Sequence, residues 1–504
     1  MKIAFATAEL APFAKSGGLG DVAASLPPCY RAAGHDVRVY VPYYTRAASF
    51  LERAWDTHRF AAVTHAGFTY HFGIYHHVTA EGVDIFLLRF DQLFGREGIY
   101  GGKDYGYADN ALRFALFQQA LLESFTVDNW MPDIIHCNDW HTSLVPAYLR
   151  VRAGADPRYG GIRTVFTIHN LAYQGVIPLA EFPELNLPGS FLAPDWVEHF
   201  GLVICMKCAL LHADWLTTVS PTYAREIQTE ERGFGFDGIL RGRTHELTGI
   251  VNGIDRAIWN PETDPHLKHH YHPGHLLGKS RCKRLLRKRL GLRQEQRTPL
   301  CGLVARLTDQ KGIDLVISIL DTLVERGVQA AFLGSGAAGY EDELRRCSQR
   351  HPGMVSASFD FDDPLAHQIE AGADIFLMPS RFEPCGLNQM YSLAYGTIPI
   401  VHRTGGLADT VVDFTPETMA NGTATGFLFD EPTTEALLDV VLRAIEIFEF
   451  EPALWRQLQR SAMSQDFSWQ HSAAEYLGLF AKLHARQIAA GEAGRLAALP
   501  PPAG

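Results

Sequence analysis

The most informative segment of the sequence is Met378-Pro379-Ser380-Arg381-Phe382-Glu383-Pro384-Cys385-Gly386-Leu387-Asn388-Gln389. An apolar segment from Ala373 to Met378, typical of a buried strand, ends here in a polar loop, and a helical pattern of apolar residues follows. In a parallel α/β sheet, ligands bind at such junctions. Gly386 allows backbone to approach a ligand closely, and Glu383 supplies the carboxylate of the loop. The alternative interpretation is an ordinary connection whose glutamate favours the helix N-terminus.

The length, composition and charge of the chain indicate how many domains it has and which kinds of partner are excluded. A chain of 504 residues exceeds what one hydrophobic core supports, so at least two domains are expected. No apolar run approaches the ~20 residues of a membrane span, and the N-terminus reads as a strand rather than a signal peptide. We therefore expect a cytoplasmic protein without a membrane partner. The net charge of -11 argues against a nucleic-acid partner.

Strand-like and helix-like segments alternate along the chain in two series. Strands are predicted in the first half at 3–7, 37–41, 85–88, 134–137, 164–169 and 215–220, and in the second half at 300–305, 330–334, 354–359, 373–378 and 398–401. Helical spacing is clearest at 111–125 and 202–212. This alternation predicts an α/β protein with two doubly wound, largely parallel sheets and a cleft between the two halves.

Four segments follow from this pattern. We predict an N-terminal Rossmann-like domain over 1–248, a second Rossmann-like domain over 249–467, a C-terminal helix over 468–488 that returns to the first domain, and a disordered tail over 489–504. The Pro- and His-rich segment from Asn252 to Gly278 suits an irregular crossing between domains. The tail is rich in Ala, Gly and Pro, which favours disorder.

Three loops of the first half carry polar residues at predicted strand ends. Lys15 is followed by Gly17 and Gly18 just before a helix, an arrangement in which backbone amides can point at an anion. Asp139 and His169 follow the strands at 134–137 and 164–169. Either polar cluster alone suits a structural role, but two clusters at one sheet edge indicate function.

The second half adds two cations at a strand end. Arg306 ends one predicted strand, and Lys311 follows five residues later at a helix start. Two cations that converge suit a diphosphate leaving group, on which negative charge grows as the bond breaks. The alternative is a pair of exposed loop cations. Glycine loops at 334–336 and 404–406 also follow strands and suit nucleotide contacts.

Other patterns favour structural interpretations. Cys205 and Cys208 form a C-x-x-C, but they lie in an apolar run and are interpreted as core thiols. The Asp360-Phe-Asp-Asp run could be a metal-binding D-x-D, yet its place before a helix favours a capping role. The basic run from Lys279 to Arg289 is typical of a solvated helix face, although its position near the domain junction leaves a functional role open.

Taken together, the motifs resemble those of bacterial glycogen synthases, in glycosyltransferase family 5. The matching stretches are Lys15-Ser-Gly-Gly-Leu, Asn138-Asp-Trp-His, Thr167-Ile-His-Asn-Leu-Ala-Tyr-Gln-Gly, Val251-Asn-Gly-Ile-Asp, Ala305-Arg-Leu-Thr-Asp-Gln-Lys-Gly, Arg381-Phe-Glu-Pro-Cys-Gly-Leu-Asn-Gln and Arg403-Thr-Gly-Gly-Leu-Ala-Asp-Thr. They span 1 to about 485 in the family's order. The resemblance implies a GT-B architecture and a retaining hexosyltransferase (EC 2.4.1.21) that moves glucose from ADP-glucose to the non-reducing-end 4-hydroxyl of an α-1,4-glucan such as glycogen.

The resemblance also implies roles for individual residues. Arg306 and Lys311 resemble the diphosphate clamp, Glu383 the carboxylate that holds donor-sugar hydroxyls, His169 the residue beside the sugar 6-hydroxyl, and Asp139 the acidic residue near the acceptor. The further donor or nucleotide contacts predicted are Lys15, Gly17, Gly18, Gly334, Cys385, Gly386, Leu387, Thr404, Gly405 and Gly406, and the further sugar or acceptor contacts are Asp21 and Asn170. No metal or pyridoxal phosphate cofactor is expected.

Two positions depart from the patterns of related transferases. The second glutamate of an E-x7-E pattern would fall at 391, which is Tyr391, and no asparagine precedes Lys283, so the roles of Lys279 and Lys283 stay open. The rival functions are a glucan phosphorylase, which would need a Schiff-base lysine, and a non-catalytic glucan-binding protein. The sequence indicates neither an oligomeric state nor allosteric regulation, and it does not by itself separate ADP-glucose from UDP-glucose.

Overall fold

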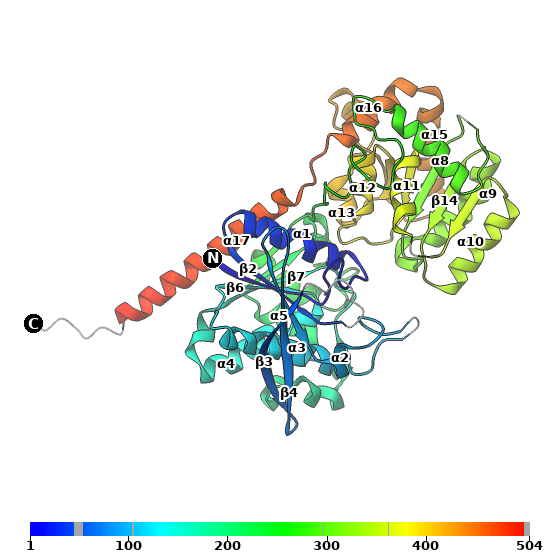
Figure 1. The fold of residues 1–504 in the computed structure, drawn as a ribbon. Coiled ribbons are helices and arrows are strands. Elements are labelled where there is room, and N and C mark those ends of the chain that lie inside the picture. The colour runs from blue at the N-terminus through cyan, green and yellow to red at the C-terminus, as the bar shows by residue number, and fades with distance from the viewer. Residues whose placement is uncertain (45–53, 103–104, 296, 361, 498–504) are drawn as a thin grey trace, which may run out of the picture. The chain divides into compact units, whose positions relative to one another are not determined.

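The structure, a computed structural model, describes residues 1–44, 54–102, 105–295, 297–360 and 362–497. The chain divides into two compact α/β units, shown in Figure 1. Unit 1 comprises Met1–Val219, Ala224–Ile250 and the C-terminal segment from Trp469, and unit 2 comprises Ser220–Tyr223 and Val251–Ser468. The chain passes between the two units after Ile250 and after Ser468.

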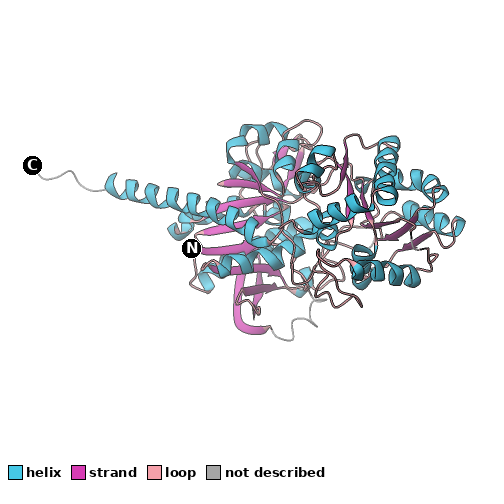
Figure 2. Ribbon diagram, turned by 90° about the horizontal axis from the view of Figure 1, so that it is seen from above, coloured by secondary structure: helices cyan, strands magenta, loops and turns pink. Residues whose placement is uncertain are grey.

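Unit 1 is built on a nine-stranded sheet with the order β12-β11-β7-β6-β1-β2-β5-β4-β3, counted over the described residues. All neighbouring pairs are parallel except β3–β4 and β4–β5. The strands are β1 (Lys2–Ala6), β2 (Asp36–Pro42), β3 (Trp55–His65), β4 (Phe68–Val78), β5 (Asp84–Arg89), β6 (Ile134–Asn138), β7 (Arg163–Ile168), β11 (Trp215–Thr218) and β12 (Leu247–Gly249). Helices lie on both sides of these strands (Figure 2).

The helices of unit 1 follow the alternation that the sequence predicts. They are α1 (Gly18–Ala32), α2 (Asp91–Phe94), α3 (Asn110–Val127), α4 (Val145–Ala155), α5 (Cys205–His212), α6 (Pro221–Glu226, at the division between the units), α7 (Asp237–Gly242) and α17 (Trp469–Ala497). The prediction of one helix over 202–212 is partly wrong. Residues Leu202–Ile204 form strand β10, which pairs with β8 (Val176–Pro178) and β9 (Glu198–His199) in a small antiparallel sheet.

Helix α17 packs on unit 1. The rings of Tyr476 and Phe480 lie 6.4 and 5.5 Å from the ring of Tyr30 on α1, and 4.9 and 5.6 Å from that of His136 on β6. These buried aromatic contacts hold the C-terminal helix against the domain that begins the chain. The helix continues to Ala497, past the end predicted at 488, and 498–504 lie outside the described residues.

Unit 2 contains a six-stranded parallel sheet with the order β15-β14-β13-β16-β17-β18, again over described residues. Its strands are β13 (Leu300–Val304), β14 (Gln329–Leu333), β15 (Val355–Ser358), β16 (Ile375–Met378), β17 (Ile398–His402) and β18 (Phe427–Phe429). Its helices are α8 (Leu277–Arg289), α9 (Ile313–Glu325), α10 (Ala338–Arg350), α11 (Asp363–Gly372), α12 (Asn388–Tyr395), α13 (Gly405–Thr410), α14 (Pro416–Ala420), α15 (Thr434–Phe450) and α16 (Pro452–Met463).

Most strands of unit 2 are buried on both faces, as is usual in a parallel sheet. On β16, Ile375 and Leu377 belong to one hydrophobic cluster, whereas Phe376 and Met378 belong to the cluster on the opposite face. The alternation arises because successive side chains of a strand point to opposite faces. The strand that precedes the Pro379–Gln389 stretch is thus fixed on both sides, so the loop starts from a rigid edge.

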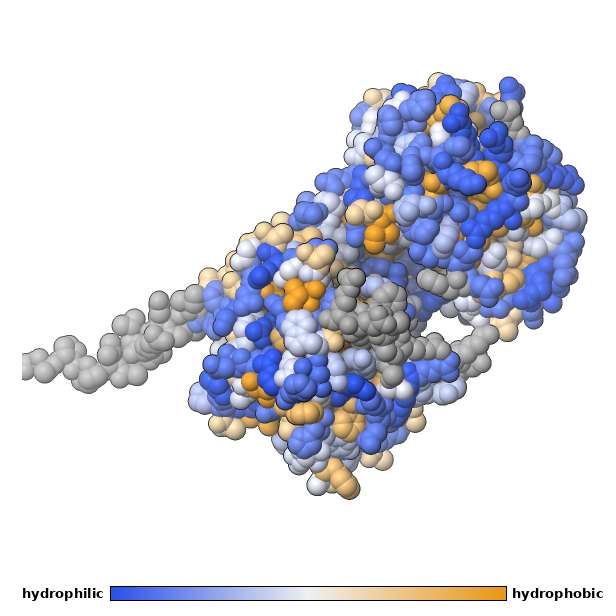
Figure 3. Space-filling view, in the orientation of Figure 1, coloured by the Kyte–Doolittle hydropathy of each residue, from blue (hydrophilic) through white to orange (hydrophobic). Residues whose placement is uncertain are grey.

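The cysteines and the apolar segments agree with their interpretation from the sequence. Cys205 and Cys208 are buried free thiols whose pKa values burial raises to about 12, which confirms that they are core residues. No helix among the described residues is long and apolar enough to cross a membrane. The face shown in Figure 3 is mostly hydrophilic, with scattered hydrophobic patches.

Candidate active site

The turn between β1 and α1 closes on a carboxylate of the chain itself. The backbone N–H groups of Ser16 and Gly17 donate to the Glu9 carboxylate at 2.7 and 3.1 Å. Glu9 is buried, and the sequence analysis missed it. The Gly17 amide, which the sequence predicted to contact the donor, donates to Glu9 in this structure. Lys15 Nζ pairs with Asp21 Oδ1 at 2.7 Å and keeps 43% of its side chain exposed, so it stays accessible to a ligand.

Asp139 lies directly after β6, at the start of the 3-10 turn Trp140–Thr142. Its φ of +56° lies in a region that non-glycine residues rarely adopt, which is typical of constrained functional positions. One carboxylate oxygen accepts from the backbone N–H of His169 at 2.8 Å, across the neighbouring strands β6 and β7. Burial raises the pKa of Asp139 to about 7. The structure thus brings the predicted pair Asp139 and His169 together, with Asn170 next in the chain.

The protonation of His169 follows from its neighbours. Burial lowers the pKa of His169 to about 3, so the ring is neutral at physiological pH. Its Nε2 lies 2.9 Å from Asn138 Oδ1, and the amide nitrogen of Asn138 donates to the carbonyls of Ala6 and His136. Because Oδ1 can only accept, His169 Nε2 carries the proton and Nδ1 is left as an acceptor. A neutral acceptor of this kind suits a sugar hydroxyl. Asn138 was not among the site residues predicted from the sequence.

In unit 2, the predicted phosphate-binding and sugar-binding residues lie on two neighbouring loops. Lys311 Nζ lies 2.5 Å from Glu383 Oε2, and the Ser380 hydroxyl donates to the same oxygen at 3.0 Å. Glu383 is only 6% exposed, so its charge depends on these two partners. Arg306 is exposed and, among the described residues, forms no ion pair. Lys311 thus forms an ion pair with Glu383, whereas Arg306 has no carboxylate partner among the described residues.

Close backbone packing ties these two loops together. Gly312, with φ of +64°, follows Lys311, and a Cβ at this position would lie 2.2 Å from the carbonyl oxygen of Pro379. The N–H of Arg381 donates to the carbonyl of Gln310 at 2.8 Å, and its guanidinium pairs with Asp314. The loops after β13 and β16 therefore form one rigid layer.

The predicted glycine loops at 334–336 and 404–406 pack closely against these same two loops. A Cβ on Gly405 would lie 2.0 Å from the Glu383 carbonyl oxygen, and one on Gly406 would lie 2.2 Å from that of Cys385. The N–H of Gly406 also donates to the Glu383 carbonyl at 3.1 Å. Gly334 packs in the same way, since its Cβ would lie 1.8 Å from the carbonyl oxygen of Ala305. These glycines are required by backbone packing around Glu383 and Arg306, which the interpretation as nucleotide contacts did not anticipate.

The start of α12 completes the loop. Gly386 has φ of +74°, which favours glycine, and the Gln389 side chain donates to the carbonyls of Cys385 and Gly386 at 3.0 Å. Cys385 is buried, and burial raises the pKa of its thiol to about 12, so it is not a thiolate. Leu387 precedes α12 and Thr404 precedes α13. Their backbones therefore lie at helix starts on the carboxyl edge of the sheet, where ligands bind.

Comparison with known proteins identifies the family. Residues 2–242 match the family model described as starch synthase catalytic domain, and residues 286–452 match glycosyl transferases group 1. A glycogen synthase of Anaeromyxobacter dehalogenans (strain 2CP-C) is 46% identical over 96% of this chain and 100% of its own length. The chain belongs to the bacterial glycogen synthase family. Glycogen synthase 2 of Geobacter sulfurreducens is also similar, at 42% identity over 95% of this chain and 98% of that protein.

Solved structures agree with this assignment. The catalytic domain of starch synthase IV from Arabidopsis thaliana, bound to ADP and acarbose, is 33% identical and superimposes with a TM-score of 0.87 over 96% of this chain and 99% of that chain. Sucrose-phosphate synthase from Thermosynechococcus elongatus, at 17% identity and a TM-score of 0.60 over 96% and 99% of the two chains, shares the fold. The prediction of a GT-B protein with two Rossmann-like domains is confirmed.

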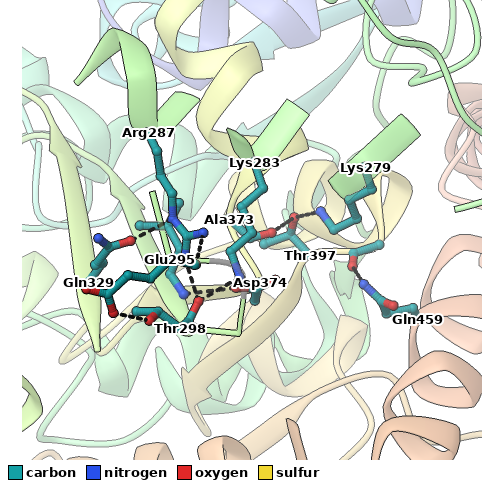
Figure 4. Close-up of polar contacts among 12 residues, drawn as sticks. Lys279, Lys283, Arg287, Glu295, Thr298, Gln329, Ala373, Asp374, Thr397 and Gln459 are labelled. Carbon is teal, nitrogen blue, oxygen red and sulfur yellow. Dashed lines mark hydrogen bonds and ion pairs between the residues drawn. The ribbon is translucent and has the colours of Figure 1, made fainter. Parts of the chain in front are cut away.

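The basic helix α8 of the synthase lies away from the candidate phosphate clamp. Lys279, Lys283 and Arg287 point into unit 2, as Figure 4 shows. Lys283 Nζ lies 2.5 Å from Asp374 Oδ2 and donates to the Thr298 carbonyl at 2.7 Å. Asp374 directly precedes β16 and Thr298 closely precedes β13, so these contacts lie at the amino edge of the parallel sheet. Arg306 and Glu383 follow the carboxyl ends of the same two strands.

The outward-facing interpretation of this basic run is therefore wrong for its buried positions. Lys279 Nζ bonds to the Thr397 hydroxyl just before β17, and Arg287 Nε donates to the Gln329 side chain at the start of β14. Burial lowers the pKa of Lys279 to about 8, and among the described residues its amino group has only uncharged hydrogen-bond acceptors. Lys279, Lys283 and Arg287, spaced four residues apart on α8, thus bind groups at the amino ends of the strands and stabilise them.

The acidic run before α11 also has a structural role. Asp362 caps the helix, with its carboxylate accepting from the Leu365 N–H at 2.8 Å. The same carboxylate pairs with Arg289 on α8. The capping interpretation is confirmed for Asp362.

Proposed function

We propose that this synthase transfers glucose from ADP-glucose to the non-reducing-end 4-hydroxyl of an α-1,4-glucan with retention of configuration. The observation that carries the proposal is similarity over nearly the whole chain to glycogen synthases. The relative bound to ADP and acarbose supports a nucleoside diphosphate on the donor side and an oligosaccharide on the acceptor side.

We assign the departing ADP to Arg306 and Lys311. Negative charge grows on the β-phosphate as the glycosidic bond breaks, and fixed cations stabilise that charge. Arg306 is free to form paired hydrogen bonds with phosphate oxygens. Lys311 gives one of its three N–H donors to Glu383, so two remain for phosphate. Lys15, exposed on unit 1, is assigned to the same diphosphate.

The sugar contacts are assigned to the carboxylate and the neutral imidazole. Glu383 accepts hydrogen bonds from donor-sugar hydroxyls, while Lys311 and Ser380 hold its carboxylate in place. The Nδ1 lone pair of His169 accepts from the 6-hydroxyl, and Asp139 lies on the acceptor side. The acceptor hydroxyl attacks from the face that ADP leaves and passes its proton to a leaving phosphate oxygen, so the configuration is retained.

Donor competition tests this function. Purified protein receives glycogen and an equimolar mixture of ADP-glucose and UDP-glucose, with only one donor labelled in each reaction. We expect label in glycogen chiefly from ADP-glucose, and digestion by an α-1,4-specific amylase should release it. Incorporation chiefly from UDP-glucose would overturn the donor assignment, and absence of incorporation from either donor would overturn the function.

A further inference from the structure

Three side chains that commonly bind metal ions cluster in unit 2, outside the candidate active site. A ring nitrogen of His266, a carboxylate oxygen of Asp363 and a ring nitrogen of His367 all lie within 4.8 Å of one another. Asp363 and His367 are four residues apart on α11, which places them on one face of the helix. His266 comes from the irregular segment before α8, and its Nε2 lies 3.9 Å from Asp363 Oδ2.

A buried carboxylate orients the central histidine. His367 is 1% exposed, and its Nδ1 lies 2.8 Å from an oxygen of Asp264, which is fully buried. The same carboxylate accepts from the Tyr395 hydroxyl at 2.6 Å and from the backbone N–H of His266 at 2.8 Å. Because Asp264 accepts all three bonds, Nδ1 of His367 carries a proton and Nε2 is the nitrogen left for a ligand. Carboxylate, imidazole and metal are arranged in this way in many zinc sites.

Stacking fixes the imidazole plane as well. The Trp259 ring lies 3.9 Å from the His367 ring at an angle of 7°, and 3.7 Å from the Tyr391 ring at 9°. The carbonyl of His266 accepts from the Gln368 side chain at 3.2 Å, so its backbone is held at both polar groups. The ring of His367 and the backbone of His266 are thus positioned before any ion binds, which favours a specific metal site.

The second ring nitrogen of His367, Nε2, forms no hydrogen bond with another described residue. Among the described residues, each hydrogen bond of the His367 ring involves Nδ1. Nε2 is therefore available to an ion that binds between the three side chains. Two imidazoles and one carboxylate favour Zn²⁺, whereas Mg²⁺ and Ca²⁺ prefer ligand sets made of oxygen alone.

The cluster can contract to the geometry of zinc. Bonds of about 2.0–2.2 Å in a tetrahedral site place the ligand atoms roughly 3.3–3.6 Å apart. The side chains of His266 and Asp363 are 32% and 55% exposed, so both can move by the small distance required. The buried, doubly fixed ring of His367 would then determine where the ion lies.

We propose that His266, Asp363 and His367 bind one Zn²⁺ ion, with water in the fourth position. The ion fastens the segment before α8 to the first turns of α11. It takes no part in glucosyl transfer, because the cluster contains none of the residues assigned to donor or acceptor. The site is distinct from the D-x-D interpretation, since Asp362 serves as a helix cap.

Zinc binding to the untagged, chelator-treated full-length protein tests the proposal. Isothermal titration with zinc sulfate should give one site per chain. His266→Ala and Asp363→Asn, both at partly exposed positions, should each weaken that site at least tenfold. His275→Ala is the matched control, because His275 is an exposed histidine of the same segment outside the cluster. Its affinity for zinc should equal that of the wild type.

Two further readouts separate this site from adventitious binding. Zinc should raise the thermal midpoint of the wild type and of His275→Ala but leave those of the two ligand variants unchanged. Co²⁺ in place of Zn²⁺ should show the intense visible absorption of a four-coordinate site. Equal zinc affinity in the wild type and both ligand variants, or no stoichiometric site in the wild type, would overturn the proposal. Turnover of ADP-glucose should be the same with and without zinc, so the two proposals can fail separately.

Discussion

Lys311 and Glu383 form an ion pair of 2.5 Å although 72 residues separate them in the chain. Lys311 lies on the loop after β13 and Glu383 on the loop after β16, and these strands are neighbours in the parallel sheet. Both side chains are largely buried, at 18% and 7% exposure. Lys311, the proposed phosphate ligand, is therefore bound directly to Glu383, the proposed sugar ligand. Replacing either residue should change the position and the charge balance of the other.

Replacing Lys311 by Met should lower both stability and turnover. The loss leaves Glu383 buried with Ser380 as its remaining side-chain partner, and a buried unpaired carboxylate costs roughly 1–3 kcal/mol. The double variant Lys311→Met, Glu383→Gln should recover most of that stability in urea denaturation but remain inactive. Additive losses in the double variant would show that the two residues do not interact energetically.

Replacing Arg306 by Ala should lower kcat by roughly 10²- to 10³-fold, the usual loss for one transition-state donor. Stability should be unchanged, because Arg306 is exposed and has no ion-pair partner among the described residues. Arg346→Ala on the surface of α10 is the control for removal of an arginine, and it should keep full turnover. Wild-type turnover in folded Arg306→Ala would remove this residue from the mechanism.

Asp139→Asn should stabilise the protein in a pH-dependent way while it lowers activity. The pKa of Asp139 in the folded state is about 7, above the ordinary value of 3.8, so the folded protein binds the proton more tightly between these values. The stability of the wild type therefore falls relative to that of the variant as the pH rises from about 4 to 7. A difference of roughly 2–4 kcal/mol is expected at pH 8 and little at pH 4. Urea denaturation at both pH values measures it, and an equal difference at both would contradict the assignment.

Gly406→Ala should destabilise unit 2 and reduce turnover together. The new Cβ would lie 2.2 Å from the Cys385 carbonyl oxygen, which must move and displace the backbone beside Glu383. We expect a loss of roughly 2 kcal/mol or more. Gly339→Ala on α10 is the control, because no atom lies within 4 Å of its Cβ, and it should be within about 1 kcal/mol of the wild type. Thermal midpoints and kcat of both variants check this.

Lys283→Met should cost stability but leave donor binding intact. The substitution leaves the carboxylate of Asp374 in the interior without its ion-pair partner, at roughly 1–3 kcal/mol. Since Lys283 lies at the amino edge of the sheet, the KM for ADP-glucose should stay within about twofold of the wild type. A large rise in KM with unchanged stability would instead make Lys283 a phosphate ligand.

Much of the fold can be predicted from local sequence patterns. Each strand expected from the sequence overlaps a strand of the structure, because burial on both faces of a parallel sheet requires a short apolar run. The hairpin of β3 and β4 escaped prediction because its strands are largely exposed and rich in His and Thr. The positions of Asp139, His169, Arg306 and Glu383 could be predicted because each follows a strand end.

Local sequence patterns were thus enough to predict the alternation of strands and helices and the side chains at the carboxyl edges. Which of these side chains form ion pairs or hydrogen bonds within the protein became visible in the folded chain. In the folded protein the amides of Ser16 and Gly17 donate to Glu9, and Lys283 forms an ion pair with Asp374. Gly406 packs closely against the loop that carries Glu383. The physical reason is that apolar periodicity is a local property of the chain, whereas hydrogen bonds and ion pairs join residues far apart in it. Those partners are set when strands distant in the chain become neighbours in a sheet.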